Sequence, residues 1–162
     1  MKSDWKEQEK IRVPGDVPIG GAFPTMGELD GTRMTRIFTG WGPLPAVVAT
    51  RDQTGGWNAA GQTRTVHLSD GSQAQEQLTG YAAPHSFTYT VTPNTGVLSL
   101  LISNAEGKWW FFPLPGGGTE IWWRYELRPR TPWRWPVLLL VAVLWEQYME
   151  RALTLLVTEI ER

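Results

Sequence analysis

The sequence contains no cysteine, which excludes disulfides and thiolate metal sites and is typical of a reducing compartment. It has little histidine either, since His67 and His85 are the only two, too few for a histidine-rich metal centre. A basic excess is also missing: 15 Lys and Arg residues stand against 16 Asp and Glu residues, for a net charge of -1. With so little positive charge to neutralise phosphates, we expect no binding to nucleic acid.

Long apolar runs are missing as well. The longest, Val137–Trp145, has nine residues, whereas a membrane-spanning helix needs about 20. We therefore expect no membrane span and interpret this run as a buried helix. The charged residues at the N-terminus lack the apolar core of a signal peptide, so we expect a cytoplasmic protein.

The residues that are present suit one globular domain spanning residues 1–162. Hydrophobic residues make up 41% of the chain and charged residues 19%, which is far from the composition of a disordered chain. Ten tryptophans are many for this length and favour a pocket or a contact surface built from flat rings.

The aromatic side chains are concentrated in one stretch, Gly107–Leu127. Two prolines and the glycines 116–118 divide it into two strands joined by a turn. Because side chains alternate across a strand, one face carries no charge and is expected to point inward. That face holds Trp109, Phe111, Ile121, Trp123, Tyr125 and Leu127, and the wetter face holds Trp110, Phe112, Trp122, Arg124 and Glu126.

Around this aromatic hairpin we expect an antiparallel meander of five or six strands over Gln62–Leu127. A strand with alternating Phe87, Tyr89 and Val91 lies within it, and Val97–Ser103 leads into the hairpin. Upstream, Glu7–Val13 reads as a weak edge strand. Short helices fit near residues 17–23 and 29–38, and the Gly- and Pro-rich remainder of residues 14–61 reads as loop.

The first hairpin of the meander turns at Asp70-Gly71, a strong signal for a two-residue turn. In that register Thr65 pairs with Glu76, and His67 shares a face with Glu76. A one-residue bulge would exchange the two faces, so the inward face of this hairpin stays open.

The chain ends in one long helix, from Pro132 or Pro136 to Ile160. Apolar residues at positions 141, 144, 148, 152, 155 and 156 form a stripe at helical spacing. An amphipathic helix that follows an antiparallel sheet is expected to pack on the apolar face of that sheet.

Several short motifs, taken in order, resemble the SRPBCC (START/Bet v 1-like) superfamily, in its polyketide cyclase/dehydrase and lipid-transport branch. They are Gly61-Gln62-Thr63-Arg64, Asp70-Gly71, Glu76, Pro84 with Phe87 and Tyr89, Gly107-Lys108-Trp109 with Phe111, Gly118-Thr119 with Trp123, and Tyr148-Met149 with Ala152 and Leu153. The resemblance covers about residues 40–160 and matches residues 1–40 poorly.

This resemblance implies an α+β helix-grip fold. In it, a strongly curved antiparallel sheet of six or seven strands wraps around the long C-terminal helix, with short helices near the N-terminus. It also implies an apolar cavity that binds a hydrophobic or aromatic, lipid- or polyketide-like small molecule. The alternative is a cyclase/dehydratase-type enzyme that uses polar cavity residues and needs no metal or nucleotide cofactor.

Four polar residues are the candidates for acid/base chemistry in such a cavity. Glu76 and His67 could move protons, Arg64 could hold a carboxylate or enolate, and the Tyr89 phenol could donate to a ligand oxygen. The competing interpretation is an ordinary strand pair for His67 and Glu76, an outward salt bridge for Arg64 and a core residue for Tyr89. No metal ligands are predicted.

The candidate ligand-binding residues are mainly aromatic, and a plain core would use the same side chains. They are Trp41, Trp57, Phe87, Trp109, Phe111, Trp123, Tyr125, Leu144, Tyr148 and Met149. The outward-facing Trp110, Phe112 and Trp122 form a candidate homodimer contact.

Overall fold

The computed structural model describes residues 5–13, 31–130 and 135–160. Its elements, in chain order, are β1 Trp5–Val13, α2 Gly31–Ile37, β2 Val47–Arg51, β3 Thr63–Leu68, β4 Gln73–Ala82, β5 Ser86–Pro93, α3 Val97–Leu101, β6 Ile102–Pro113, β7 Thr119–Pro129 and α4 Trp135–Ile160.

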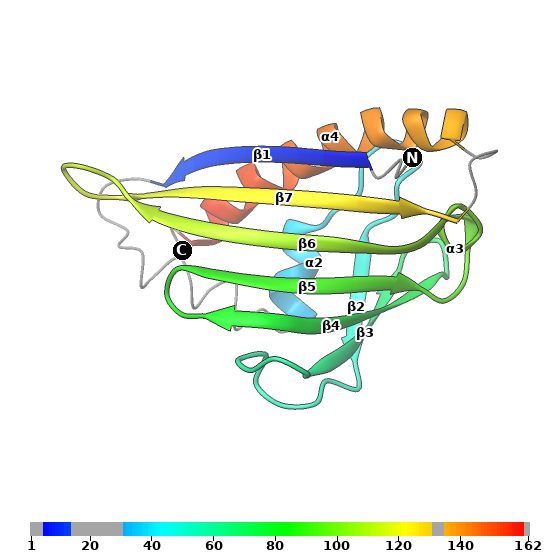
Figure 1. The fold of residues 1–162 in the computed structure, drawn as a ribbon, viewed down its shortest axis with the longest axis horizontal. Coiled ribbons are helices and arrows are strands. Elements are labelled where there is room, and N and C mark those ends of the chain that lie inside the picture. Colours follow the sequence, from blue (N-terminus) through cyan, green and yellow to red (C-terminus); the bar gives the residue numbers. More distant parts are fainter. Residues whose placement is uncertain (1–4, 14–30, 131–134, 161–162) are drawn as a thin grey trace.

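All the described strands belong to one antiparallel sheet of seven strands, in the order β1-β7-β6-β5-β4-β3-β2. Helices α2 and α4 lie on the same face of this sheet, with α4 running along its length (Figure 1). The register slips at Leu78/Gly80 in β4, and such a bulge bends a strand and strengthens its twist. The predicted helix-grip arrangement, a curved antiparallel sheet around a long C-terminal helix, is confirmed.

The aromatic hairpin is formed by β6 and β7, and its two faces are as predicted. Trp109 lies opposite Trp123, and Phe111 lies opposite Ile121, so the inward side chains meet across the strands. All six inward side chains are buried, and the rings of Trp109 and Trp123 stack with centroids 4.6 Å apart and planes 13° apart. The outward ring of Trp110 is covered by cations instead, with Lys108 Nζ 4.8 Å from its centroid.

The predicted two-residue register of the β3–β4 hairpin is wrong by one residue. Arg64, not Thr65, pairs with Glu76, and His67 pairs with Gln73. Gly71 N donates to Leu68 O, Leu68 N donates to Ser72 O, and Gly71 has a φ of +85°. The connection is a three-residue loop, a type I turn followed by a glycine bulge. Asp-Gly is compatible with this loop and also with the two-residue turn.

This one-residue shift decides which side chains face the core. Arg64, Val66, Ala74, Glu76 and Leu78 are buried, and they lie on the face that packs against the helices. His67 lies on the opposite face of β3, so its predicted placement on one face with Glu76 is wrong.

The first third of the chain differs in part from the expectation. The edge strand predicted at Glu7–Val13 is β1, which pairs with β7. Helix α2 falls within the helix predicted at 29–38, whereas the one predicted near 17–23 lies outside the described residues. Strand β2 lies in the part of residues 14–61 that is predicted to be loop, because its short Val-Val run gives no periodicity.

Residues 97–101 form α3, a helix, and not the start of the strand expected to lead into the aromatic hairpin. Gly96 precedes it with a φ of +84°, a left-handed conformation that glycine reaches without strain. Arg130 N donates to Leu101 O, which ties this short helix to the end of β7.

Helix α4 packs on the sheet through a stripe rotated slightly from the predicted one. Its buried residues are Ala142, Tyr148, Met149, Ala152, Leu153 and Leu156. The interpretation of Val137–Trp145 as a buried helix is wrong for half of the run, because Val137, Leu139, Leu140 and Val143 are exposed. Within the described residues, no helix combines the length and apolar character needed to cross a membrane.

Candidate functional site

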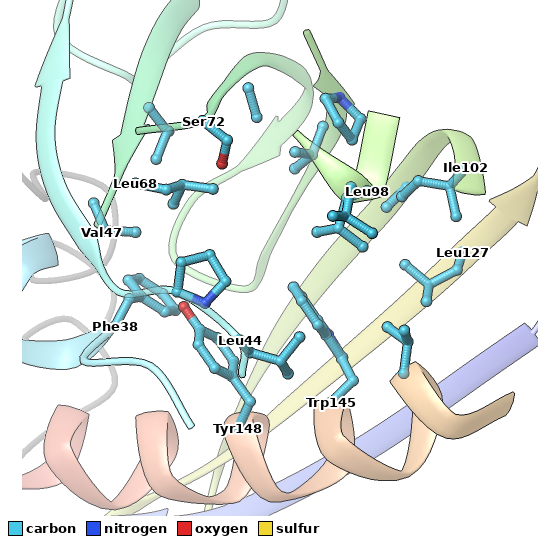
Figure 2. A pocket seen from close by; sticks show the side chains of 18 of the residues that line it. Phe38, Leu44, Val47, Leu68, Ser72, Leu98, Ile102, Leu127, Trp145 and Tyr148 are labelled. Atoms are coloured by element: carbon cyan, nitrogen blue, oxygen red, sulfur yellow. The ribbon is translucent and has the colours of Figure 1, made fainter. Parts of the chain in front are cut away.

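A cavity of about 300 Å³ lies between the inward face of the sheet and helix α4. Its lining comes from the sheet, from helices α2, α3 and α4, and from the loop around Leu44. Figure 2 shows Trp145 and Tyr148 rising from α4 into this space, with Leu98 of α3 and Leu127 of β7 facing it. Most lining residues are apolar, as expected where strands and helices turn their apolar faces toward each other.

A small polar group interrupts this apolar lining. Glu76 comes from β4, Tyr89 from β5, Tyr125 from β7 and Tyr148 from α4, and all four line the cavity. All four are buried. A few polar groups on a mostly apolar wall are the usual means by which a pocket orients its ligand.

Tyr89 is held at the centre of this group by two indoles. Trp123 Nε1 donates to its hydroxyl oxygen over 3.2 Å, and Trp109 Nε1 donates to the same oxygen over 3.4 Å. The ring passes directly over Gly107, where a Cβ would collide with it. Because both lone pairs of the phenol are engaged, its hydrogen can only be donated to an acceptor.

Glu76 forms a buried ion pair with Arg64, which does not line the cavity. Arg64 Nε donates to Glu76 Oε2 over 2.6 Å, with only 6% and 11% of the two side chains exposed. The guanidinium also lies 4.0 Å from the ring centroid of Trp57. This contact is a cation-π interaction, and it fixes the cation on the side of Glu76 away from the ligand space.

The phenols of the group are neutral at physiological pH. Burial raises the pKa of Tyr89, and the nearby Glu76 charge raises it further. Burial likewise raises the pKa of Tyr125 and Tyr148, with smaller contributions from Tyr89 and Glu76. Neutral phenols can donate hydrogen bonds, and their raised pKa values disfavour the phenolate form that a base would need.

Unused donors remain at the cavity wall. Trp145 Nε1 is buried, and no described residue accepts its hydrogen. Its ring stacks on Tyr148, with centroids 5.0 Å apart, and lies 5.0 Å from the ring of Tyr125. A buried N–H without an acceptor is costly, so an oxygen supplied by a bound molecule would stabilise this corner of the cavity.

The structure brings some of the candidate residues into the cavity wall and leaves others outside it. Glu76, Tyr89, Trp123, Tyr125, Leu144 and Tyr148 line the cavity. Trp57, Phe87, Trp109, Phe111 and Met149 are buried but lie behind the lining, where they support it. Arg64 does not line the cavity, but it is paired with Glu76, which does.

Two candidates lie apart from the cavity. His67 faces away from it, because the register of β3 with β4 places His67 on the face opposite to Arg64 and Glu76. Trp41 is exposed on a loop, with Arg151 6.0 Å from its ring centroid. Among the described residues no cluster of His, Asp and Glu side chains could hold a metal ion.

Several lining residues were missed from the sequence. They include Met34, Phe38, Leu44, Val47, Leu98, Leu101 and Trp145. Leu44 and Val47 lie in the predicted loop, and Leu98 and Leu101 in the predicted strand, so no helical spacing indicates them. Met34 and Phe38 fall in the short helix predicted at 29–38, which has no other sign of a cavity. Trp145 can be predicted from the sequence, because it lies four residues after Val141 and three before Tyr148, at the spacing of the apolar stripe.

Comparison with solved structures agrees with this architecture. Ara h 8.0201 superposes with a TM-score of 0.69 at 14% identity, covering 98% of this chain and 98% of that one. A norcoclaurine synthase mutant from Thalictrum, in complex with a transition-state analogue, gives a TM-score of 0.66 at 13% identity, covering 98% and 97%. A protein from Nitrosospira multiformis gives 0.62 at 17% identity, covering 96% of both chains. These similarities establish a shared fold.

No curated protein matches the sequence. The family model described as polyketide cyclase/dehydrase and lipid transport matches residues 29–161, which include the cavity-lining helices α2, α3 and α4 and the strands β2–β7. The chain therefore belongs to the polyketide cyclase/dehydrase and lipid-transport family, within the SRPBCC superfamily.

Proposed function

We propose that the protein binds a hydrophobic or aromatic small molecule, lipid- or polyketide-like, in the cavity between the sheet and α4. The observation that carries this proposal is the cavity itself, about 300 Å³ of space with a mostly apolar lining. That volume is at the lower end of the range of about 300–1,000 Å³ for small-molecule sites, so the ligand is compact or only partly enclosed.

The polar group implies that the ligand carries at least one acceptor oxygen. Tyr89 can only donate, and Trp145 Nε1 has no acceptor among the described residues. An oxygen placed between the phenols and this indole would meet neutral donors. A purely aliphatic ligand would leave those donors unsatisfied, which costs binding free energy.

The test compares two tryptophans on opposite faces of β7. Trp123→Ala removes a cavity-lining ring, and Trp122→Ala removes an outward ring that donates to Glu120. We expect Trp123→Ala to raise the Kd of an apolar fluorescent probe by about tenfold or more, and Trp122→Ala to leave it nearly unchanged.

A second variant tests the cavity without removing a buried ring. Ala105→Leu adds carbon atoms to a buried position in the cavity wall and should also weaken the probe by filling space. Far-UV circular dichroism shows whether each variant is folded. Equal effects of the two tryptophan substitutions on the Kd would refute binding of the probe in the cavity. Native mass spectrometry of the purified protein would identify a retained ligand.

The second candidate function is a cyclase or dehydratase, favoured because Glu76 lines the cavity together with three phenols on which its charge acts. Glu76 would accept a proton, Tyr89 would donate to a carbonyl oxygen, and Arg64 would position Glu76. Glu76→Gln should abolish cyclisation of a linear polyketide-like substrate while Glu106→Gln does not. Unchanged turnover in Glu76→Gln would remove this residue from the mechanism.

Two further features stay predictions. A cytoplasmic location is testable by cell fractionation. A homodimer through Trp110, Phe112 and Trp122 is testable by sedimentation of the Trp122→Ala variant.

A further inference from the structure

The wall of the cavity carries charge of one sign. Among the residues that line it in the described part of the chain, the charged side chains are Asp70 and Glu76, and no lysine, arginine or histidine is present. A site that binds a carboxylate places a cation or a charge-assisted donor against it, because an unpaired buried anion is costly. The lining therefore provides no positive charge to compensate that of an anionic ligand.

The cation beside Glu76 does not change this. Arg64 Nε lies 2.6 Å from Glu76 Oε2, and the guanidinium lies 4.0 Å from the ring centroid of Trp57. Glu76 lines the cavity, whereas Arg64 does not. The pair therefore presents its negative member to a ligand, and its positive member is already engaged by a carboxylate and an aromatic ring.

The phenols of the cavity show how their surroundings act on an anion. Tyr89, Tyr125 and Tyr148 line the cavity together with Glu76. Burial raises the pKa of each phenol, and the charge of Glu76 contributes in the same direction. Arg64 lowers the pKa of Tyr89, yet that pKa is raised on balance. Both causes that disfavour a phenolate here also disfavour a ligand carboxylate placed beside these rings.

A second carboxylate stands at the exposed rim of the cavity. Asp70 Oδ1 accepts from Ser72 Oγ over 2.5 Å and from Ser72 N over 2.9 Å, and these bonds hold the pKa of Asp70 below its ordinary value. Figure 2 shows Ser72 across the ligand space from Trp145 and Tyr148. A ligand that turned its carboxylate toward this rim would again meet a negative charge, which water screens in part.

The donors that the cavity offers are neutral. Trp145 Nε1 is buried and has no acceptor among the described residues, and the Tyr89 hydroxyl can only donate. The rings of Tyr125 and Tyr148 each lie 5.0 Å from the ring of Trp145, so these groups are close together. A carbonyl or hydroxyl oxygen can accept from them without bringing a net charge out of water.

We propose that the cavity selects neutral carbonyl compounds and alcohols over carboxylates, and that it admits a carboxylic acid only in its protonated form. Glu76 sets this preference, because its charge lines the ligand space and that of Arg64 does not. The preference rests on the proposed ligand-binding function, whose ligand it narrows to one chemical class.

The experiment compares two ligands of nearly the same shape by equilibrium dialysis against the full chain. They are acetylnaphthalene, a methyl ketone, and naphthoate, a carboxylate, both substituted at the same ring position. Compact two-ring compounds suit a cavity of about 300 Å³. At about pH 7.5 we expect naphthoate to bind at least about a hundredfold more weakly than the ketone, because its charge must leave water unpaired. Equal Kd values would overturn the proposal.

The pH dependence separates exclusion of the anion from a difference in shape. If only the protonated acid binds, the Kd of naphthoate falls by about tenfold for each unit between about pH 7.5 and about pH 5.5, which lies above an ordinary carboxyl pKa of about 4. The ketone does not titrate, so its Kd reports any change in the protein itself. A Kd of naphthoate that changes no more than that of the ketone would refute the proposal, and this measurement needs no variant.

A substitution assigns the preference to Glu76. Glu76→Gln removes the charge from the lining and leaves Arg64 uncompensated, so it should narrow the ratio of the two Kd values by about tenfold or more. The matched control is Glu106→Gln, which removes a charge from an exposed ion pair with Arg128 and should leave the ratio as in the parent. An unchanged ratio in folded Glu76→Gln would contradict the proposal.

The ketone also distinguishes failure of this preference from failure of the ligand-binding function. Ketone binding that Trp123→Ala weakens, together with equally tight binding of naphthoate, would leave the proposed function standing and refute the preference. If neither compound bound at any pH, the function and the preference would both be refuted.

Discussion

Replacing Glu76 by glutamine removes the negative charge from a buried ion pair and keeps nearly the same shape. The parent pair joins Arg64 Nε and Glu76 Oε2 over 2.6 Å, with only 6% and 11% of the side chains exposed. The guanidinium is held in addition over the ring of Trp57. In the variant, a cation remains where water does not reach, and the charge of Glu76 no longer compensates it.

The size of the effect follows from this burial. Removing one partner of a buried ion pair costs about 3–5 kcal/mol, and the Trp57 ring and the new amide offset part of it, so we expect a loss of about 3 kcal/mol. With a urea m-value of about 2 kcal/mol/M, the unfolding midpoint would fall by about 1.5 M. Urea unfolding followed by tryptophan fluorescence measures this directly.

The chain offers a matched control for the same substitution. Arg128 and Glu106 form an ion pair of 2.9 Å in which 42% and 46% of the side chains are exposed. Glu106→Gln should cost only about 0–1 kcal/mol, because water screens that pair. The double variant Arg64→Met/Glu76→Leu should recover most of the stability, since no buried charge is left. Equal midpoint shifts in Glu76→Gln and Glu106→Gln would refute this reasoning.

The remaining predictions concern the phenols and the glycine beneath them. Because burial raises the pKa of Tyr89, Tyr125 and Tyr148 above the usual 10.0, the stability that they contribute is full below about pH 10 and falls as the pH rises further. Urea midpoints at about pH 8 and about pH 11 should reveal a loss of up to about 1.4 kcal/mol per pH unit for each tyrosine, and equal midpoints would contradict the raised pKa values. Gly107→Ala places a Cβ against the Tyr89 ring and should lower the free energy of unfolding by about 1–3 kcal/mol, so a variant as stable as the parent would show that the ring does not pass over this glycine. Tyr89→Phe deprives two buried indole N–H groups of their acceptor and should cost about 1–3 kcal/mol in thermal unfolding, whereas a neutral result would mean that water replaces the hydroxyl.

The fold could be predicted where periodicity and turn signals agree. In the two strands of Gly107–Leu127, large apolar residues alternate at 109 and 111 and again at 121, 123, 125 and 127. Three glycines mark the turn, so both strands and both faces could be predicted. The long helix followed in the same way from a stripe of apolar residues without a breaker. Strand β2 and helix α3 could not be predicted, because short apolar runs have no distinctive periodicity.

The register of β3–β4 could not be decided from the residues. Asp70-Gly71 fits both a two-residue turn and a three-residue loop with a glycine bulge, and the two differ by one position. That single position moves Arg64 to the inner face and His67 to the outer one. Half of the candidate acid/base set therefore depended on a choice between turns of similar local preference.

The Val137–Trp145 run shows a different limit. A helical segment that is apolar on all sides has no preferred face, so the sequence indicated burial without indicating which side would remain exposed. Whether buried aromatics form a wall or a solid core is likewise a question of packing. Trp123 touches the cavity while its stacking partner Trp109 stands behind it.

The stacked indoles of Trp109 and Trp123 provide an intrinsic spectroscopic signal for occupancy of the cavity. Two transition dipoles 4.6 Å apart in nearly parallel rings couple strongly, and both nitrogens share one hydrogen-bond acceptor, the oxygen of Tyr89. The resulting exciton band in far-ultraviolet circular dichroism would change whenever a guest molecule shifts Trp123. Occupancy can therefore be followed without a label, on the unmodified chain.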